Sequence, residues 1–277
     1  MLHPLIADPS ATRHVLKKFH LRAVKGLGQN FLIDANVVRQ IVEAADICAG
    51  DEVLEIGPGI GTLTQGLLEA GARVTAVEVD KKLPAVLNET LAGYENFRLI
   101  AGDILKLNVA EIMPRPFKVV ANLPYYITTQ ILLTLLEKNL PVTKIVTMVQ
   151  REVAERMTAA PGSKIYGALS VAVQLRSEAS IAFEVSPKSF LPPPEVTSAV
   201  VVCNVRKLFD VDEEFFTLVV RSAFAQRRKT LVNSLAGAGF SREKISAALT
   251  ATGIDGSRRA ETLSLAEFAE LSTALRQ

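Results

Sequence analysis

Between residues 52 and 149, short apolar, β-branched runs alternate with segments of helical periodicity, and this alternation most narrows the possible folds. The expected strands are Glu52–Ile56, Arg73–Val79, Phe97–Ala101, Phe117–Ala121 and Lys144–Val149, and the expected helices are Thr62–Ala70, Lys81–Leu91 and Thr128–Lys138. Continuous apolar strands that alternate with helices indicate a mostly parallel sheet covered on both faces. We therefore expect an α/β fold, preceded by a helix that Asp34 caps.

The pattern changes in the last third of the chain. Ser180–Val185 and Ala199–Val205 predict two further strands, separated by the proline-rich Leu191–Pro194, and a hairpin that ends the sheet fits them. Beyond Lys207 only helices are expected, and these are Glu213–Phe224, Arg228–Ala236, Glu243–Ala251 and Leu265–Leu275. We therefore predict two domains, residues 1–206 with the sheet and an all-helical domain 207–277.

Composition and charge exclude some classes of protein. No apolar stretch is long enough for a transmembrane helix, and charged residues interrupt the first 20 positions where a signal peptide would need an apolar region. The two cysteines, Cys48 and Cys203, lie far apart and predict reduced thiols rather than a disulfide framework, and no metal-ligand spacing is present. Residues 1–30 and 206–277 are net basic while the middle is net acidic, which suits a polyanionic partner.

A glycine-rich turn follows the first expected strand, with Gly57, Gly59 and Gly61 in G-x-G-x-G spacing. Glu78 ends the second strand and Asp103 follows the third. Ligands of open α/β sheets bind at these carboxyl ends, where one carboxylate can accept ribose hydroxyls and the other an adenine amino group. Each feature alone has an ordinary structural explanation, but together they predict a nucleoside site. The spacing differs from the G-x-G-x-x-G of nicotinamide dinucleotide sites, the main rival.

Asn122-Leu123-Pro124-Tyr125 follows the fourth expected strand. An adenine amino group is a weak nucleophile because its nitrogen lone pair is delocalised into the ring. Two acceptors that hydrogen-bond to its two N–H groups would favour a pyramidal nitrogen, whose lone pair is available for attack. The Asn122 side chain can be one acceptor, and Pro124 keeps Leu123 extended so that a main-chain carbonyl can be the other. Tyr125 can stack on an extruded base. The structural alternative is a strand-ending turn with a buried tyrosine.

With these residues, the chain resembles the ribosomal RNA adenine dimethyltransferase family, and within it the bacterial enzymes of the small subunit. The other matching segments are Gly28–Asp34, Gln150–Met157, Lys164–Gly167, Val173–Gln174, Phe190–Pro194, Ser198–Val201 and Phe224–Leu231. The resemblance implies a Rossmann-like class I methyltransferase domain, a small helical C-terminal domain and S-adenosylmethionine as cofactor. By the same match, Asn30 and Leu32 join Gly57, Glu78, Asp103 and Asn122 as cofactor contacts. Thr197 departs from the family, which usually has Asp there.

The family also implies a substrate and a setting. The substrate would be two adjacent adenosines in the 3′-terminal hairpin loop of small-subunit RNA within a 30S particle, each receiving two methyl groups in the cytoplasm. Phe183 aligns with an aromatic that could sandwich the target base against Tyr125, although a core position is an equal alternative. Arg227, Arg228 and Lys229 are candidate phosphate contacts, or else a solvated helix face. We expect a monomer and no membrane association.

Three other functions remain open from the sequence. A large-subunit RNA adenine methyltransferase of the antibiotic-resistance type is the nearest, although Phe224–Leu231 and the triple proline argue against it. A DNA adenine methyltransferase commonly has Pro where Leu123 lies, and no separate base-recognition domain is visible. A non-enzymatic checkpoint in 30S assembly belongs to a different class of function, and the intact Asn122 and Glu78 favour an active enzyme.

Overall fold

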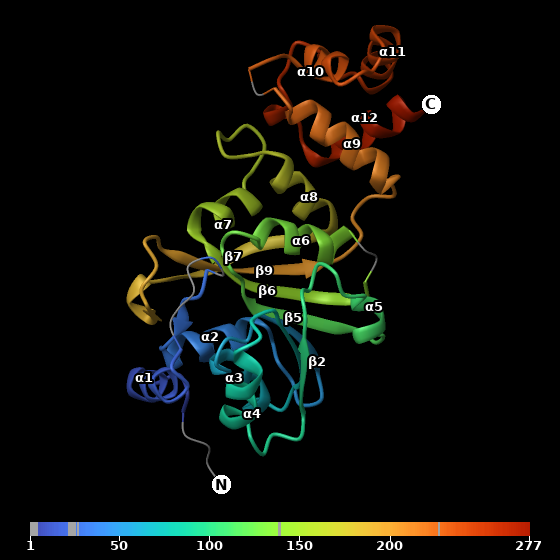
Figure 1. Ribbon diagram of the computed structural model, residues 1–277. Coiled ribbons are helices and arrows are strands. Elements are labelled where there is room, and N and C mark those ends of the chain that lie inside the picture. The colour runs from blue at the N-terminus through green and yellow to red at the C-terminus, as the bar shows by residue number, and fades with distance from the viewer. Residues whose placement is uncertain (1–4, 22–25, 27, 138–139, 227) are drawn as a thin grey trace. The chain divides into compact units, whose positions relative to one another are not determined.

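The computed structural model describes residues 5–21, 26, 28–137, 140–226 and 228–277 (Figure 1). Its strands are β1 (Phe31–Leu32), β2 (Glu52–Ile56), β3 (Arg73–Glu78), β4 (Phe97–Ala101), β5 (Phe117–Asn122), β6 (Val142–Gln150), β7 (Ser177–Val185), β8 (Phe190–Leu191) and β9 (Ser198–Val205). Its α-helices are α1 (Pro9–Lys18), α2 (Ala35–Ala44), α3 (Thr62–Glu69), α4 (Leu83–Thr90), α5 (Val109–Ile112), α6 (Thr128–Glu137), α7 (Arg151–Met157), α8 (Ala168–Arg176), α9 (Glu213–Phe224), α10 (Leu231–Gly237), α11 (Arg242–Thr252) and α12 (Leu265–Arg276).

The chain divides into two compact units. The first comprises residues 1–154 and 180–205, and the second comprises 155–179 and 206–277. At the predicted boundary near residue 206 the chain passes from the first unit to the second. The predicted assignment of residues 155–179 to the sheet domain is wrong. These residues belong to the helical unit because Tyr166, Val171 and Leu175 are buried in the same core as Phe216 and Phe268.

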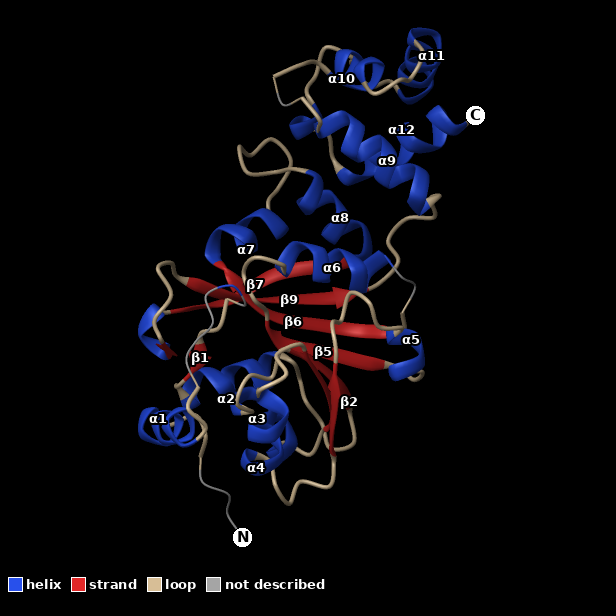
Figure 2. Cartoon of the chain, in the orientation of Figure 1, coloured by secondary structure: helices blue, strands red, loops and turns tan. Residues whose placement is uncertain are grey.

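A seven-stranded sheet organises the first unit, in the order β4-β3-β2-β5-β6-β9-β7 (Figure 2). The neighbours from β4 through β6 run parallel, and β9 runs antiparallel to β6. The mostly parallel sheet is therefore confirmed, with β9 and β7 ending it as expected. From β2 the chain continues outward to β3 and β4 on one side of the sheet, and from β5 it continues to β6 on the other side. Open α/β sheets bind ligands at such a switch point, which here lies between β2 and β5.

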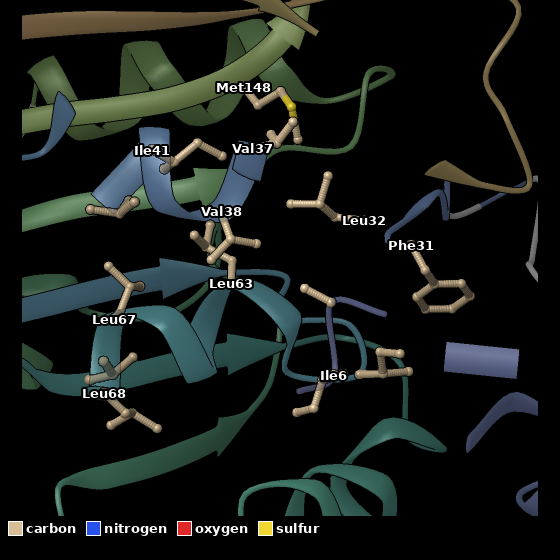
Figure 3. Packing of buried hydrophobic residues seen from close by; sticks show 14 of the residues in the cluster. Ile6, Phe31, Leu32, Val37, Val38, Ile41, Leu63, Leu67, Leu68 and Met148 are labelled. Atoms are coloured by element: carbon tan, nitrogen blue, oxygen red, sulfur yellow. The ribbon is translucent and has the colours of Figure 1, made fainter. Parts of the chain in front are cut away.

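Both faces of the central strands β2, β3, β5 and β6 are buried, as their continuous apolar runs predict. Val53, Val120 and Val146 belong to the cluster that packs against α2, α3 and α4. Figure 3 labels members of this cluster from α2 and α3, together with Met148 of β6. The chain neighbours of these valines, Leu54, Val119 and Ile145, are equally buried but lie outside that cluster, because successive strand residues point to opposite faces.

Local interactions fix where the site-bearing elements begin. The Asp34 side chain accepts hydrogen bonds from the backbone N–H groups of Asn36 and Val37, which confirms it as the N-cap of α2. The β1 strand does not join the large sheet; it pairs antiparallel with β8. Near the start of the chain, the Ile6 N–H donates to Gln65 Oε1 on α3 at 2.9 Å. Ile6 is thus anchored on α3, and β1 itself is anchored on β8.

The second unit is a small helical assembly. Side chains of Asp212, Thr230, Ser241 and Ser264 cap α9, α10, α11 and α12. Because Thr230 caps α10, that helix begins at Leu231 rather than at Arg228 as predicted. The expected all-helical character of the C-terminal region is confirmed.

Candidate active site

One cavity in the first unit opens at the carboxyl ends of β2, β3 and β5 and beside the turn after β4. Ten residues predicted from the sequence lie in its wall, and these are Asn30, Leu32, Gly57, Gly59, Glu78, Asp103, Asn122, Leu123, Pro124 and Tyr125. Positions nearly a hundred residues apart in the chain therefore meet at one place, as the parallel sheet requires.

The glycine turn between β2 and α3 depends on left-handed backbone angles. Gly57, Gly59 and Gly61 have φ of 71°, 61° and 94°, where a Cβ would strain the chain. At Gly61, the N-cap of α3, a Cβ would also approach the Leu91 side chain to 3.2 Å. Gly61 does not line the cavity. A glycine is required there by the left-handed backbone of the turn and by the close packing against Leu91.

Glu78 is a buried acceptor at the end of β3, with only 5% of its surface exposed. Its Oε1 accepts the backbone N–H of Asp80 at 2.8 Å. Burial raises the pKa of the Glu78 carboxyl, while backbone N–H groups of Asp80 and Gly59 act to lower it. A carboxylate held in this way can accept further hydrogen bonds from paired hydroxyls of a ligand in the cavity.

Asp103 lies in the turn after β4, in the cavity wall and half-buried. Its Oδ1 accepts the Leu105 N–H at 3.1 Å, and Lys106 Nζ lies 3.8 Å from Oδ2. The backbone contact fixes the direction of the carboxylate, so Asp103 can receive an amino group from a ligand.

Glu55 was not singled out from the sequence, yet it lines the same cavity from β2. Its side chain is 1% exposed, and Oε2 has no hydrogen-bond partner among the described residues. Burial raises the pKa of Glu55 to about 8, and the nearby Glu78 carboxylate adds to the rise. The Thr64 hydroxyl favours the charged form without reaching hydrogen-bond geometry, so burial dominates. The signal in the sequence was an acid flanked by the apolar residues Leu54 and Ile56 of an expected strand.

The Asn122–Tyr125 segment follows directly from β5. Asn122 Nδ2 donates to the Asn30 carbonyl at 3.4 Å, an orientation that leaves Oδ1 directed to accept. The Pro124 carbonyl is already bonded to the Thr128 hydroxyl at 2.9 Å. Among the described backbone contacts, none engages the carbonyl of Leu123. The segment therefore offers two acceptors, one from a side chain and one from the main chain.

Tyr125 is held by a residue whose role the sequence did not reveal. Its hydroxyl lies 2.6 Å from Ser198 Oγ, at the start of β9. Burial raises the pKa of the Tyr125 hydroxyl, and the contact with Ser198 opposes that rise. Thr197, the departure from the family, uses its carbonyl to accept the Arg151 N–H at 3.0 Å, a main-chain contact that any residue can make. The change at Thr197 therefore leaves this contact intact.

Phe183, Arg228 and Lys229 are not among the residues of the cavity wall. Phe183 is half-buried on β7 and packs against the hydrophobic core, so its contact with a base stays a prediction. Arg228 and Lys229 are exposed in the turn before α10, and Arg227 lies outside the described residues.

Neither a membrane-spanning helix nor a metal-binding cluster is found among the described residues. In the described ranges, no helix is long and apolar enough to cross a membrane. The same residues contain no group of three or more His, Cys, Asp or Glu side chains placed to hold a metal ion.

The strand order, with β9 antiparallel to β6, and a cavity lined by carboxylates at the switch point define a Rossmann-like methyltransferase domain. The model of the family described as ribosomal RNA adenine dimethylase matches residues 21–277. The chain belongs to this family.

Individual relatives agree with that assignment. Ribosomal RNA small subunit methyltransferase A of Moorella thermoacetica is 48% identical over 98% of this chain and 98% of its own length. The protein of the same name from Bacillus licheniformis is 47% identical over the same shares. Among solved structures, a dimethyladenosine transferase from Plasmodium falciparum has a TM-score of 0.75 and 26% identity, covering 87% of this chain and 95% of that one. The 23S rRNA methyltransferase ErmE has a TM-score of 0.69 and 27% identity, covering 90% and 100%.

Proposed function

We propose that this protein transfers methyl groups from S-adenosylmethionine to the amino groups of two adjacent adenosines in the 3′-terminal hairpin loop of small-subunit ribosomal RNA. The 30S particle would be its substrate, each adenosine would receive two methyl groups, and the protein would act as a monomer in the cytoplasm. The observation that carries the proposal is one cavity that joins Glu78 and Asp103 to the Asn122–Tyr125 segment. Near-full-length similarity to small-subunit enzymes supports the choice of RNA.

The cavity offers hydrogen-bond acceptors that suit the donor groups of the proposed cofactor. Glu78 would accept the two ribose hydroxyls, and Asp103 would accept the adenine amino group. The unpartnered Oε2 of Glu55 marks a place in the wall where a cationic group of the cofactor would find an acceptor. When bound, the cofactor supplies an electrophilic methyl group on a positively charged sulfur.

The protein's own task is then to present the nucleophile. Asn122 Oδ1 and the Leu123 carbonyl would grip the two N–H bonds of the target amino group and favour a pyramidal nitrogen with its lone pair free. Tyr125 would stack on the extruded base, and its bond to Ser198 keeps the ring in place. No strong general base is needed, because the ammonium product is acidic.

We assign RNA recognition outside the cavity to the helical unit, including residues 155–179 as well as 206–277. Arg228 and Lys229 are exposed cations of that unit and would contact phosphates.

The test combines mapping of the methylated nucleotides with a matched pair of variants. Labelled S-adenosylmethionine and undermethylated 30S particles should give dimethylation at the two adjacent adenosines. Asn122→Ala should lower single-turnover methyl transfer at saturating cofactor by about a hundred- to a thousandfold, the scale for losing one preorganised polar contact. Particle binding should stay within a few-fold of wild type. Asn88→Ala, the same replacement at an exposed position of α4, should behave as wild type.

Two results would contradict the proposal. Labelling confined to large-subunit RNA would show that the RNA is wrongly assigned. Near-normal transfer by Asn122→Ala would show that the acceptor is another residue, even where the modified nucleotides are those proposed.

A further inference from the structure

Two consecutive tyrosines in the turn between β5 and α6 have different surroundings. Tyr125 is half-buried and bonded through its hydroxyl to Ser198. Tyr126 also lines the cavity, but 60% of its surface is exposed. Of the large hydrophobic side chains that are exposed in the described residues, Tyr126 is the most exposed and the only aromatic.

One edge of the Tyr126 ring is nevertheless held in place. Gly28 has a φ of 61°, and a Cβ built there would lie 3.4 Å from Tyr126 Cδ1 and 3.6 Å from Pro124 Cβ. The ring therefore packs beside the backbone of Gly28 at the cavity wall, while most of its surface faces solvent. Among the described residues, no hydrogen-bond partner of its hydroxyl is found, and the contact with Gly28 is one of packing.

An isolated apolar side chain at the surface needs no functional explanation. Tyr126 differs because it stands in the wall of the cavity that a nucleobase must enter, directly beside the residue that would stack on that base. Aromatic side chains in such positions bind successive bases of single strands by stacking, and one stacked base changes affinity by about 5- to 150-fold.

We propose that Tyr126 is a stacking platform for the nucleobase that adjoins the target adenosine, and thereby helps to select which adenosine enters the cavity. The inference rests on the proposed function and adds a second base contact to it. The recognised group is an unpaired nucleobase, and a purine is favoured because its larger ring system covers more of the tyrosine face. An adenosine neighbouring the target meets that requirement.

The experiment compares Tyr126→Leu with Tyr126→Phe, which keeps the ring and serves as the matched control. Unmethylated 30S particles are reconstituted with either a purine or a pyrimidine beside the target adenosine, and kcat/KM is measured on each. Wild type and Tyr126→Phe should prefer the purine particle. Tyr126→Leu should lose about 5- to 100-fold on the purine particle and discriminate between the two particles by less than about twofold. Calorimetry should give wild-type affinity for S-adenosylmethionine in both variants.

Each contrary result has a distinct meaning. Wild-type discrimination in Tyr126→Leu would overturn the proposal. Weaker cofactor binding in Tyr126→Leu with unchanged discrimination would also overturn it, because the ring would then act through Gly28 on the cofactor side of the cavity. If wild type itself fails to methylate either particle, the proposed function has failed, and the role of Tyr126 fails with it.

Discussion

Replacing Glu55 with Gln should make the ligand-free protein more stable at alkaline pH. Burial raises the pKa of Glu55 to about 8 from an ordinary value of 4.5. Between these values the folded state holds a proton that the unfolded chain has released, so the free energy of unfolding falls as pH rises through the window. The full contribution is present below pH 4.5 and is lost as pH passes about 8.

The size of the effect follows from the width of that window. One pH unit inside the window corresponds to about 1.4 kcal/mol, and the loss tapers as pH reaches the folded-state pKa, so between pH 6 and pH 8 this carboxyl should cost wild type about 2 kcal/mol. Glutamine has the same shape and no titratable proton, and Glu55→Gln should not show this loss. The difference in unfolding free energy between the variant and wild type should therefore grow by about 2 kcal/mol between pH 6 and pH 8.

Urea unfolding at several pH values measures this difference, and the transition of the sheet-containing unit is compared between variants. Glu95→Gln is the control, since Glu95 is exposed and its replacement should leave the pH profile as in wild type. Parallel stability profiles for Glu55→Gln and wild type would show that Glu55 is ionised across the range. The unpartnered oxygen would then need another source of stabilisation, such as bound water.

Three further predictions follow from other parts of the molecule. Glu78→Ala should lower cofactor affinity by about ten- to a hundredfold while the fold survives, and unchanged affinity in calorimetric titration would remove Glu78 from the site. Ser189→Ala removes a 2.9 Å hydrogen bond to Asp34 and should destabilise the protein by about 0.5–1.5 kcal/mol, with faster amide exchange in β1; unaltered exchange would contradict this anchoring. Changing Arg228 and Lys229 together to Glu should weaken 30S binding and flatten its salt dependence without altering cofactor affinity, whereas a wild-type salt slope would mark them as solvated surface.

The sequence predicted those parts of the fold in which neighbouring residues carry the signal. Mainly apolar, β-branched or aromatic runs next to helical or turn-forming segments identified β2 and β4 to the residue, because both the run and its boundaries are local signals. Asp34 was recognisable as a cap because capping is a local interaction. Glu78, Asp103 and Asn122 were found because parallel strands bring their carboxyl ends to one edge.

Features that depend on distant partners were not predictable in the same way. The pairing of β1 with β8 involves two residues on each side, too few for any periodicity. The placement of 155–179 in the helical unit follows from a shared core, which no local pattern reveals. Ser198 was part of a recognised motif, but its contact with Tyr125 spans 73 positions of the chain.

The pairing of β1 with β8 has a consequence for how the protein is made. Asn30 and Leu32 belong to a segment whose partner strand, Phe190–Leu191, is synthesised about 160 residues later. At about 5–20 residues per second, translation needs about 8–30 s to add that partner after β1 has been made. A growing chain therefore emerges with its glycine turn and Glu78 complete while Asn30 and Leu32 still lack their anchor. Competence to hold a cofactor should arise late in translation, after most of the sheet has left the ribosome.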